Sequence, residues 1–498
     1  MKKLVEGEVS SKRLTLGAVA ACLMLAALDQ TIVTTALPKI VDDLGSLEQL
    51  SWVMTSYLFT STISAPIYGK LGDVWGRKIM MQIAIIIFVF SSLLAAIAQN
   101  MSWLLCARAA QGLGGGGLFV LAFTVVGDII PSRERGKVQG LFAAVFGLSS
   151  IVGPLLGGFF VDEFSWHWIF LINLPIGIIA LTILYVSPSK HLPTESFSPD
   201  YFGIAFLSLT IGSLIFLSSM ASSGSSLNHL SFKLLGSVCL VSFVLFIIAE
   251  LKTKDAIVPM HLFKINNFWV YSAIGLISSC ILLSVLTFVP FYLQIAKDYT
   301  PTKSGVQIVA LTAGIIFGAM ISGIIMTKTG KYKFLPLFGG MCLTFGLILM
   351  TSIKETTSSQ ILTFYLGIVG LGLGPQLTVT TTAIQNSAPP KHMGVATSTL
   401  TLLRQIGASI GVACLTWLFI VKYREYLFSN EGLKGVKSGK EMSLQSISSI
   451  PESERIIIQA ALNNGIQSVF FFITMLSIMI IILSLFAKEL KLKTRVNS

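Results

Sequence analysis

The sequence predicts an all-α integral membrane protein with fourteen transmembrane helices, and composition is the first observation behind this prediction. Hydrophobic residues make up 53% of the 498 residues, and charged residues only 12%. Because a soluble domain carries about 25% charged residues, this chain has too little charge to cover a water-facing surface. Soluble enzymes, nucleic-acid-binding proteins and disordered scaffolds are therefore excluded. The net charge of +12 is typical of the cytoplasmic Lys and Arg excess of membrane proteins, so we expect no nucleic-acid partner.

Long apolar stretches along the whole chain are the second observation. A helix needs about 20 predominantly apolar residues to cross a bilayer. The first stretch follows Lys2 and Lys3 as in a signal peptide, but it continues past Asp29 to Leu37 without a clear cleavage site. We interpret it as a retained helix. The expected spans are 14–37, 51–69, 78–98, 102–127, 138–161, 167–187, 201–221, 232–251, 268–293, 304–327, 334–352, 359–383, 393–421 and 466–487.

An internal duplication is the third observation. Residues 112–153 align with residues 370–411 without a gap, and several glycines coincide, as do Pro131 and Pro389. The chain therefore contains two related halves. Related halves around a site near the membrane midplane are typical of secondary transporters, in which one half rocks against the other.

The duplication divides the chain into three parts. We expect an N-terminal six-helix bundle at 1–190, two extra transmembrane helices at 191–265, and a C-terminal six-helix bundle at 266–498 with a long outer loop at 422–465. At the end of this loop we expect a short surface helix at 452–465, because four residues share one face: Ile456, Ile457, Ala460 and Ala461.

The distribution of Lys and Arg predicts that both termini lie in the cytoplasm. With the N-terminus inside, the inside segments carry most of the basic residues, among them Arg77, Lys78, Arg133 and Lys137. The short outside loops carry few, and short loops decide orientation. We expect a multi-pass protein of the cytoplasmic membrane.

A carboxylate inside the first span is the strongest candidate for a functional group. A charge within a span is costly and is a functional hypothesis by default. Asp29 lies about 12 Å from the outer end of its helix, and Arg108 about 9 Å from the outer end of the fourth, so the two charges lie at similar depths. Burial disfavours the ionised carboxylate, whereas a nearby Arg favours it. Small movements can then switch the proton, as proton coupling requires, although a static ion pair is the alternative.

The loop between the second and third spans has a second pattern. Its glycines permit a tight turn, Asp73 can face a helix N-terminus, and Arg77 can reach Asp128 at the cytoplasmic end of the fourth span. We expect a gating motif, with an ordinary basic loop as the alternative. The motif comprises Gly69, Gly72, Asp73, Gly76, Arg77, Lys78 and Asp128.

The fifth span is rich in glycine and contains a proline. Pro removes a backbone donor and bends a helix, and a GxxxG spacing allows close helix contact. General membrane packing is the alternative. The residues are Gly147, Gly153, Pro154, Gly157 and Gly158.

The second half is poorer in charge. Arg404 is its one clear intramembrane charge, and no span from 268 onward holds an obvious Asp or Glu partner. Glutamines can line a polar substrate path, or they can bond neighbouring helices. The candidates for this path are Gln30, Gln111, Gln376, Gln385, Arg404 and Gln405.

Cysteines and histidines show no pattern of a metal site. The six Cys fall in apolar runs without CxxC spacing, and the five His are scattered, so we expect neither a metal nor a disulfide framework. The run Gly112–Gly117 matches GxGxxG, but no strand precedes it, so the dinucleotide interpretation fails. We expect no cofactor.

These motifs resemble a known family. The segment 28–38 resembles the first-helix signature of fourteen-helix multidrug exporters of the major facilitator superfamily, the drug:H⁺ antiporter-2 family. The loop 69–78 resembles motif A of that superfamily, with Val74 where Arg is usual. Arg108 with the Gln and Gly after it resembles motif B, whose Arg is linked to proton transfer. Residues 147–158 resemble motif C, the antiporter signature, and 166–175 closely match the start of the sixth helix, with His167 where Arg is common.

The resemblance implies proton-driven efflux of amphipathic drugs, cationic or neutral, by alternating access. Its partners would be drug molecules, protons and the lipid bilayer, and we expect a monomer without enzymatic activity. Some relatives carry acidic residues deep in the second half that help to recognise dications. This sequence has none there and carries Arg404 instead, so we expect no strong preference for dications.

Three alternatives stay open. The first keeps the mechanism but exports a single metabolite, siderophore or lipid. The second is a multipass membrane enzyme, such as a lipid-linked transferase, which would need an acid, base or metal cluster at one interface. We find no such cluster. The third is a channel or receptor, against which the duplication and the single buried carboxylate argue.

Overall fold

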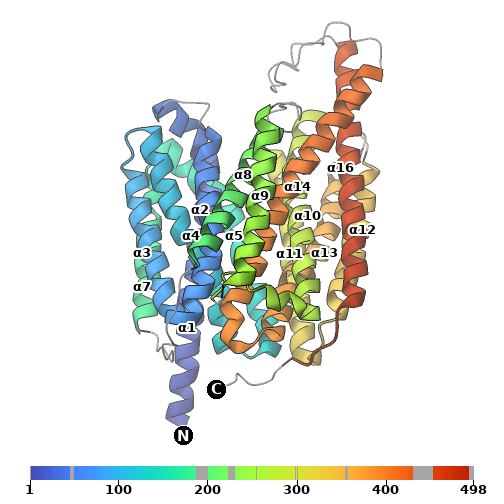
Figure 1. The fold of residues 1–498 in the computed structure, drawn as a ribbon. Helices are drawn as coiled ribbons and strands as arrows, with labels where there is room; N and C mark the ends of the chain where they lie inside the picture. Colours follow the sequence, from blue (N-terminus) through green and yellow to red (C-terminus); the bar gives the residue numbers. More distant parts are fainter. Residues whose placement is uncertain are drawn as a thin grey trace.

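The computed structural model describes residues 2–44, 50–186, 200–222, 230–253, 255–297, 299, 301–353, 357–429 and 452–492, and these residues form a bundle of helices (Figure 1). Within these ranges, twelve helical segments are long and apolar enough to cross a membrane. Two more, α2 and α8, bring the total to the expected fourteen. The helices are α1 (Lys2–Leu44), α2 (Leu50–Trp75), α3 (Arg77–Ala96), α4 (Met101–Ile129), α5 (Ser132–Glu163), α6 (Trp168–Leu171), α7 (Asn173–Val186), α8 (Tyr201–Ser222), α9 (Leu230–Lys252), α10 (Asn266–Ala296), α11 (Pro301–Thr329), α12 (Phe334–Thr351), α13 (Ser359–Ser387), α14 (Met393–Ser429) and α16 (Glu452–Phe486), with short 3-10 helices η2 (Met260–Lys264) and η3 (Pro390–His392).

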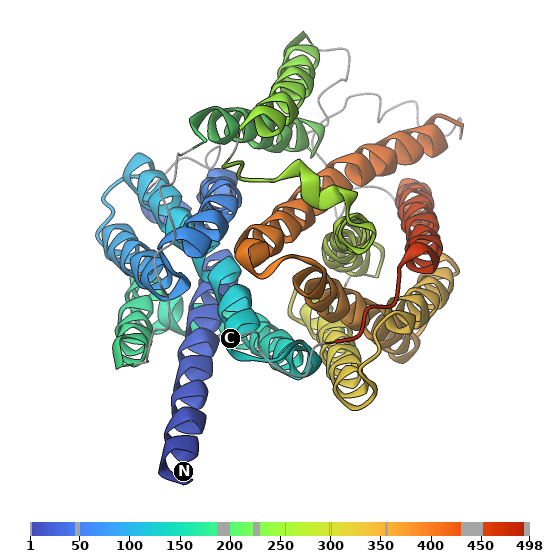
Figure 2. The ribbon, with the colours of Figure 1, turned by 60° about the horizontal axis from the view of Figure 1, so that its bottom comes forward.

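The two halves repeat the same helix packing. In the first half, α1 packs on α5, α2 on α4, and α3 on α4; in the second half, α10 packs on α14, α11 on α13, and α12 on α13. The halves meet crosswise, because α5 packs on α11 and α14 packs on α2. Figure 2 shows the first half in blue to teal, the second in yellow-green to red, and α8 and α9 in green outside the boundary between them. The extra helices reach both halves, because α8 contacts α2 and α14.

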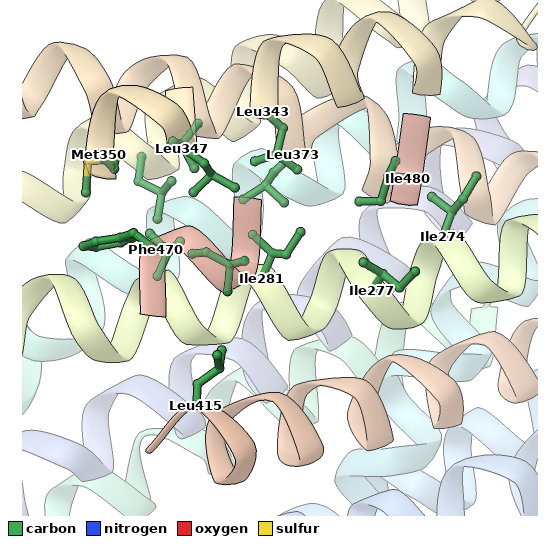
Figure 3. Close-up of a cluster of buried hydrophobic side chains, with 14 of the residues drawn as sticks. Ile274, Ile277, Ile281, Leu343, Leu347, Met350, Leu373, Leu415, Phe470 and Ile480 are labelled. Carbon is green, nitrogen blue, oxygen red and sulfur yellow. The ribbon is translucent and has the colours of Figure 1, made fainter. Parts of the chain in front are cut away.

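Each half has its own apolar core. The core of the second half joins α10, α12, α13, α14 and α16 (Figure 3), through side chains such as Ile281, Leu343, Leu373 and Phe470. The first half has two buried clusters, one of which includes Phe88 and Leu121. Lipid-facing side chains such as Phe90 and Phe471 stay exposed on the outside of the bundle, as expected of a protein whose solvent is hydrocarbon.

The glycine run of α4 serves close packing. A Cβ on Gly114 would lie 2.6 Å from the carbonyl oxygen of Ala84, and one on Gly116 would collide with the backbone of Ser61. Helices α2 and α3 therefore approach the backbone of α4 directly, as small residues allow in membranes. The packing role predicted for this run in place of a dinucleotide site agrees with these contacts.

The structure corrects the helix boundaries at two places. The expected surface helix at 452–465 does not exist as a separate element, because α16 runs without a break from Glu452 to Phe486. Gly465 lies inside it, where a Cβ would be 2.8 Å from the ring of Phe419. The helix of the sixth span is interrupted at Ile172, between α6 and α7.

The long outer loop is also shorter than expected at both ends. Helix α14 continues to Ser429, and α16 begins at Glu452. The remainder of the predicted loop 422–465 lies outside the described residues. So does the predicted boundary between the parts 1–190 and 191–265.

Candidate functional site

A buried carboxylate on α1 is the centre of a polar network in the first half. Asp29 is fully buried, and Arg108 of α4 donates from Nη1 to its Oδ2 over 2.7 Å. Its other oxygen, Oδ1, accepts from Gln111 Nε2 at 2.8 Å and from Asn173 Nδ2 at 3.0 Å. Three side chains from two helices, α4 and α7, thus donate hydrogen bonds to one carboxylate. The predicted contact between Asp29 and Arg108 is present.

The guanidinium of Arg108 is held from several sides. It is fully buried; its Nε donates to the carbonyl oxygen of Val53 at 3.3 Å, and its Nη1 to Gln111 Oε1 at 2.5 Å. It also lies over the ring of Tyr57, 4.5 Å from the centroid, within the range of a cation–π contact. Among the described residues, its Nη2 has no hydrogen-bond partner. The two N–H bonds of this nitrogen therefore make no hydrogen bond within that part of the chain.

Several members of this network are not predicted from the sequence. Ser92 of α3 accepts from Gln111 Nε2 at 2.7 Å and from Asn173 Nδ2 at 3.2 Å. The hydroxyl of Tyr57 is buried beside Arg108 and has no partner. In the sequence, Asn173 stands out only as part of the segment 166–175. The available signal was that a fully buried amide begins α7 directly after the break at Ile172.

The gating motif forms a second network at the end of the bundle where α1 begins and α16 ends (Figure 1). We call this the cytoplasmic end. Arg77 donates from Nη2 to Asp73 Oδ1 at 2.8 Å, from Nη1 to the carbonyl oxygen of Thr124 at 3.1 Å, and from Nη1 to Asp128. Gly76 has φ 99°, a left-handed conformation that favours glycine. The expected pairing of Arg77 with Asp128 is present.

Asp73 also joins the two halves. Its Oδ1 accepts from the backbone N–H of Gly394 at 2.9 Å, and its Oδ2 from that of Val395 at 3.0 Å. Both N–H groups belong to the first turn of α14, where a carboxylate is favoured by the helix dipole. The helix N-terminus expected for Asp73 is thus that of α14, in the other half. Gly69 permits this approach, because a Cβ there would lie 2.8 Å from the carbonyl oxygen of Gly394.

A matching contact links α5 with α11. Arg133 donates to the carbonyl oxygens of Thr327 and Lys328, each at 2.7 Å, where the C-terminus of α11 favours a cation. One turn further, Gly136 and Gly323 touch backbone to backbone. Both crosswise helix pairs are therefore closed at the cytoplasmic end.

The remaining motif glycines contact different neighbours. A Cβ on Gly72 would lie 2.9 Å from the side chain of Leu121, and a Cβ on Gly147 would lie 2.7 Å from the side chain of Ile316 of α11. Gly157 brings α5 against α1, since a Cβ would lie 2.8 Å from the carbonyl oxygen of Ile32. Gly153 lies in the same way on Thr31, whose hydroxyl donates to Ser149 O at 3.0 Å. Gly158 has open space around it, Pro154 lies within α5, and Lys78 donates to Tyr185 O at 3.3 Å.

Arg404 in the second half contacts neutral groups. Its Nη2 donates to the carbonyl oxygen of Leu377 at 2.8 Å, to Thr380 Oγ1 at 2.6 Å and to Thr381 Oγ1 at 3.0 Å. Its Nε is buried without a partner. Among the described residues, no carboxylate forms an ion pair with it. The cation is thus solvated by hydroxyl and carbonyl oxygens alone.

The glutamines proposed for a substrate path have different surroundings. Gln376 is fully buried and donates to Pro336 O at 2.8 Å, and Gln385 donates across the halves to Phe123 O at 3.0 Å. Both bond neighbouring helices, which was the alternative interpretation. Gln111 belongs to the Asp29 network. Gln30 and Gln405 are partly buried, and Gln405 Oε1 has no partner.

Comparison with known proteins places this geometry in a family. The model of the Major Facilitator Superfamily matches residues 19–412. The chain belongs to the major facilitator superfamily. Among its relatives in this superfamily is the multidrug transporter protein MdtP of Bacillus subtilis, 36% identical over 417 residues, which cover 83% of this chain and 76% of MdtP. Multidrug resistance protein 3 of the same organism is 35% identical over 405 residues, covering 81% of this chain and 79% of that protein.

Solved structures of major facilitator proteins share the fold. The human organic anion transporter MFSD10 superposes with a TM-score of 0.64 at 14% identity, covering 95% of this chain and 99% of that one. A double-tryptophan variant of XylE gives a TM-score of 0.65 at 12% identity, covering 97% and 98%. The protein is thus a multi-pass membrane transporter of this superfamily.

Proposed function

We propose that the protein is a proton-coupled antiporter that exports amphipathic drugs, cationic or neutral, across the cytoplasmic membrane. One observation carries this proposal: Asp29 and Arg108 form a fully buried ion pair at 2.7 Å inside a membrane transporter. Such a pair is costly to bury. Its retention is accounted for if proton binding to Asp29 is a step of transport. The names of the relatives, a multidrug transporter and a multidrug resistance protein, support drugs as the substrates.

The network provides a route from proton binding to movement. Ionised Asp29 holds donors from α4 and α7 at once. Protonation removes its charge, so the attraction of Arg108 weakens and the guanidinium is released toward its neighbours. Because Arg108 already lies on the ring of Tyr57 of α2, the change reaches the helix that carries the gating motif. Proton binding at mid-membrane is thereby coupled to the cytoplasmic end.

The closed cytoplasmic end is one half of an alternating-access cycle. The bonds of Asp73 of α2 to α14 and of Arg133 of α5 to α11 hold the halves together there. We propose that these contacts form while the drug site faces outward and break when it faces inward. Arg404 lies in the N-terminal third of α14 and has no carboxylate partner among the described residues. Its charge would disfavour dications in the central site, which agrees with the expectation of no strong preference for dications.

Efflux by inside-out vesicles under an imposed pH gradient tests this function. Wild-type vesicles should take up a fluorescent amphipathic drug when the gradient is applied and release it when the gradient is collapsed. Asp29→Asn keeps the shape of the side chain and removes the charge, so gradient-driven uptake should be abolished at normal expression. Asp162→Asn, an exposed carboxylate at the end of α5, is the matched control and should transport like wild type. Full uptake by Asp29→Asn would falsify the coupling role.

A dedicated exporter of one metabolite, siderophore or lipid has the same mechanism. A panel of unrelated amphipaths in the vesicle assay separates the two candidates. Export of several unrelated compounds supports the multidrug function, whereas export of a single chemical type supports the dedicated exporter.

A further inference from the structure

Two carboxyl groups lie buried at the cytoplasmic end of the extra helices, apart from the Asp29 network. Asp200 directly precedes α8 and is 4% exposed, and Glu250 lies in the last turn of α9 and is 3% exposed. A buried carboxylate without a compensating partner is strongly disfavoured. The pair therefore requires an explanation that the transport mechanism does not supply.

Each carboxyl group has one satisfied and one unsatisfied oxygen. Asp200 Oδ1 accepts from the N–H of Gly203 at 2.8 Å, and Glu250 Oε2 accepts from the N–H of Val258 at 2.9 Å. The other two oxygens, Asp200 Oδ2 and Glu250 Oε1, are buried and have no hydrogen-bond partner among the residues that the structure describes. Two orphaned acceptors thus remain in one buried region.

The two orphaned oxygens face the same small space. A Cβ built on Gly203 would collide with Asp200 Oδ2 and would lie 2.9 Å from Glu250 Oε1. The glycine leaves this space open, and the oxygens border it from α8 and α9. Two carboxylates that share a site cannot both ionise without a large penalty.

Within the described part of the chain, the surrounding charges do not neutralise two carboxylates. The charged groups found there to act on Glu250 are Asp200 and Lys70 of α2. Lys70 donates to Asp255 Oδ1 at 3.2 Å, so its charge is already engaged by a third carboxylate. The described residues contain no group of three or more Asp, Glu, His or Cys side chains that could hold a metal ion. A proton fits the space better than a metal cation does.

We propose that Asp200 and Glu250 form a second proton-binding site, in which one proton is shared between Asp200 Oδ2 and Glu250 Oε1. The proton turns one orphaned acceptor into a donor, so a single O–H···O bond satisfies both oxygens. It also removes one of two like charges. The proposal concerns the resting structure and does not depend on the proposed transport function.

The site ties the extra helices to the gating helix. Glu250 holds the N–H of Val258, and Val258 packs in a cluster with Ile63 of α2 and Leu402 of α14. Loss of the shared proton leaves two carboxylates that repel each other beside Lys70. Lys70 precedes Asp73 of the gating motif by three residues on α2. Docking of α8 and α9 on α2 is therefore strongest when the cytoplasmic side is acidic.

Thermal unfolding of the purified full-length protein in detergent tests the site. All proteins carry Asp29→Asn, so that the proposed transport proton is silent and failure of either proposal can be recognised separately. A folded state that holds a proton which the unfolded chain releases loses stability as the pH rises. The parent Tm should therefore fall between mildly acidic and alkaline pH. In Glu250→Gln the amide N–H₂ donates to Asp200 Oδ2 at every pH, so its Tm should fall less than that of the parent over the same pH range.

Two further variants and one direct readout decide the result. Asp200→Asn should behave like Glu250→Gln, and Asp162→Asn should behave like the parent. Infrared titration should show one protonated carboxyl group in the parent that both amide variants lack. Equal pH dependence in the parent and both amide variants overturns the proposal. A parent Tm that rises with added Na⁺ or Ca²⁺ at constant pH also overturns it, because it identifies a cation site instead.

Discussion

At the scale of single residues, Asp29 is distinguished by the number and origin of its partners. Arg108, Gln111 and Asn173 all donate to it, and they come from α4 and α7. Each donor to a charged group contributes about 1.5–3 kcal/mol. The affinity of Asp29 for a proton therefore depends on how closely these helices hold together, and each donor can be removed singly.

Arg108→Ala should move the pH profile of efflux upward. The cation that favours ionised Asp29 is lost, so the carboxylate takes up its proton at higher pH. The shift is measured from drug uptake by inside-out vesicles at several pH values. An unchanged profile in a folded, membrane-inserted variant contradicts the pairing.

Asn173→Leu should shift the profile in the same direction but less. It removes one neutral donor at 3.0 Å and keeps the approximate volume. Drug uptake by inside-out vesicles at several pH values measures the shift. Thr182→Val, an exposed position on the same helix α7, serves as control. A profile identical to wild type excludes Asn173 from the coupling network.

The sequence predicted the charges of this site but not its neutral members. Asp29 and Arg108 stand out because charges are rare within spans. Asn173, Ser92 and Tyr57 do not, because a buried amide or hydroxyl is equally common where helices bond each other. Gln376 and Gln385 show the same ambiguity, because the sequence made them candidates for a substrate path, whereas both bond neighbouring helices.

At the scale of helices, the gate consists of helix ends placed on one another. Asp73 on α2 meets the positive end of α14, and Arg133 on α5 meets the negative end of α11. Such contacts contribute about 0.3–1 kcal/mol each when exposed and up to about 2 kcal/mol when partly buried. The closed state is therefore held by several modest terms that one proton-driven rearrangement can overcome.

Asp73→Ala should open the cytoplasmic end more often than Asp128→Ala does. Asp73 bonds the other half directly, whereas Asp128 acts through Arg77. The measurement is the rate of maleimide labelling of Ser398→Cys, which lies against Gly69 in the closed state. Both exposed native cysteines, Cys106 and Cys414, are first replaced by serine. Labelling that stays at the wild-type rate in both variants argues against the gate.

The helices could be predicted from the sequence where apolar stretches alone determine them. The prediction was wrong where packing between helices determines where a helix begins. The wrong expectation of a separate surface helix at 452–465 rested on the face shared by Ile456, Ile457, Ala460 and Ala461, but α16 continues from Glu452 to Phe486. In the structure Gly465 instead allows α16 to pass close to Phe419. The partner of Asp73 was equally beyond prediction, because α14 follows it by more than three hundred residues and meets it only when the halves assemble.

At the scale of the whole molecule, the proposed antiport with one strong carboxylate in the transport path predicts one proton per cycle. A membrane potential of 100 mV is worth about 2.3 kcal/mol per charge, and one pH unit about 1.4 kcal/mol. Together they support a gradient of roughly a few hundred-fold for a neutral drug. For a monovalent cation exchanged against one proton, the charge movements cancel.

Exchange of a monovalent cationic drug should therefore be insensitive to membrane potential. Reconstituted liposomes with a potassium diffusion potential provide the measurement, and a neutral drug provides the comparison that should respond to the potential. A potential-driven current with the monovalent cation contradicts the one-proton scheme.

The contact between Gly136 and Gly323 has a practical consequence. No side chain separates the two backbones, and a Cβ on Gly323 would lie 2.8 Å from the N–H nitrogen of Lys137. A single methyl group at this point acts as a wedge that penalises only the conformation with the cytoplasmic end closed, by about 1–3 kcal/mol. Gly323→Ala should therefore enrich the inward-facing conformation roughly 5- to 150-fold, and distance measurements between spin labels on α5 and α11 can record this shift. The same substitution then provides a means of capturing the opposite conformation for structure determination without any ligand.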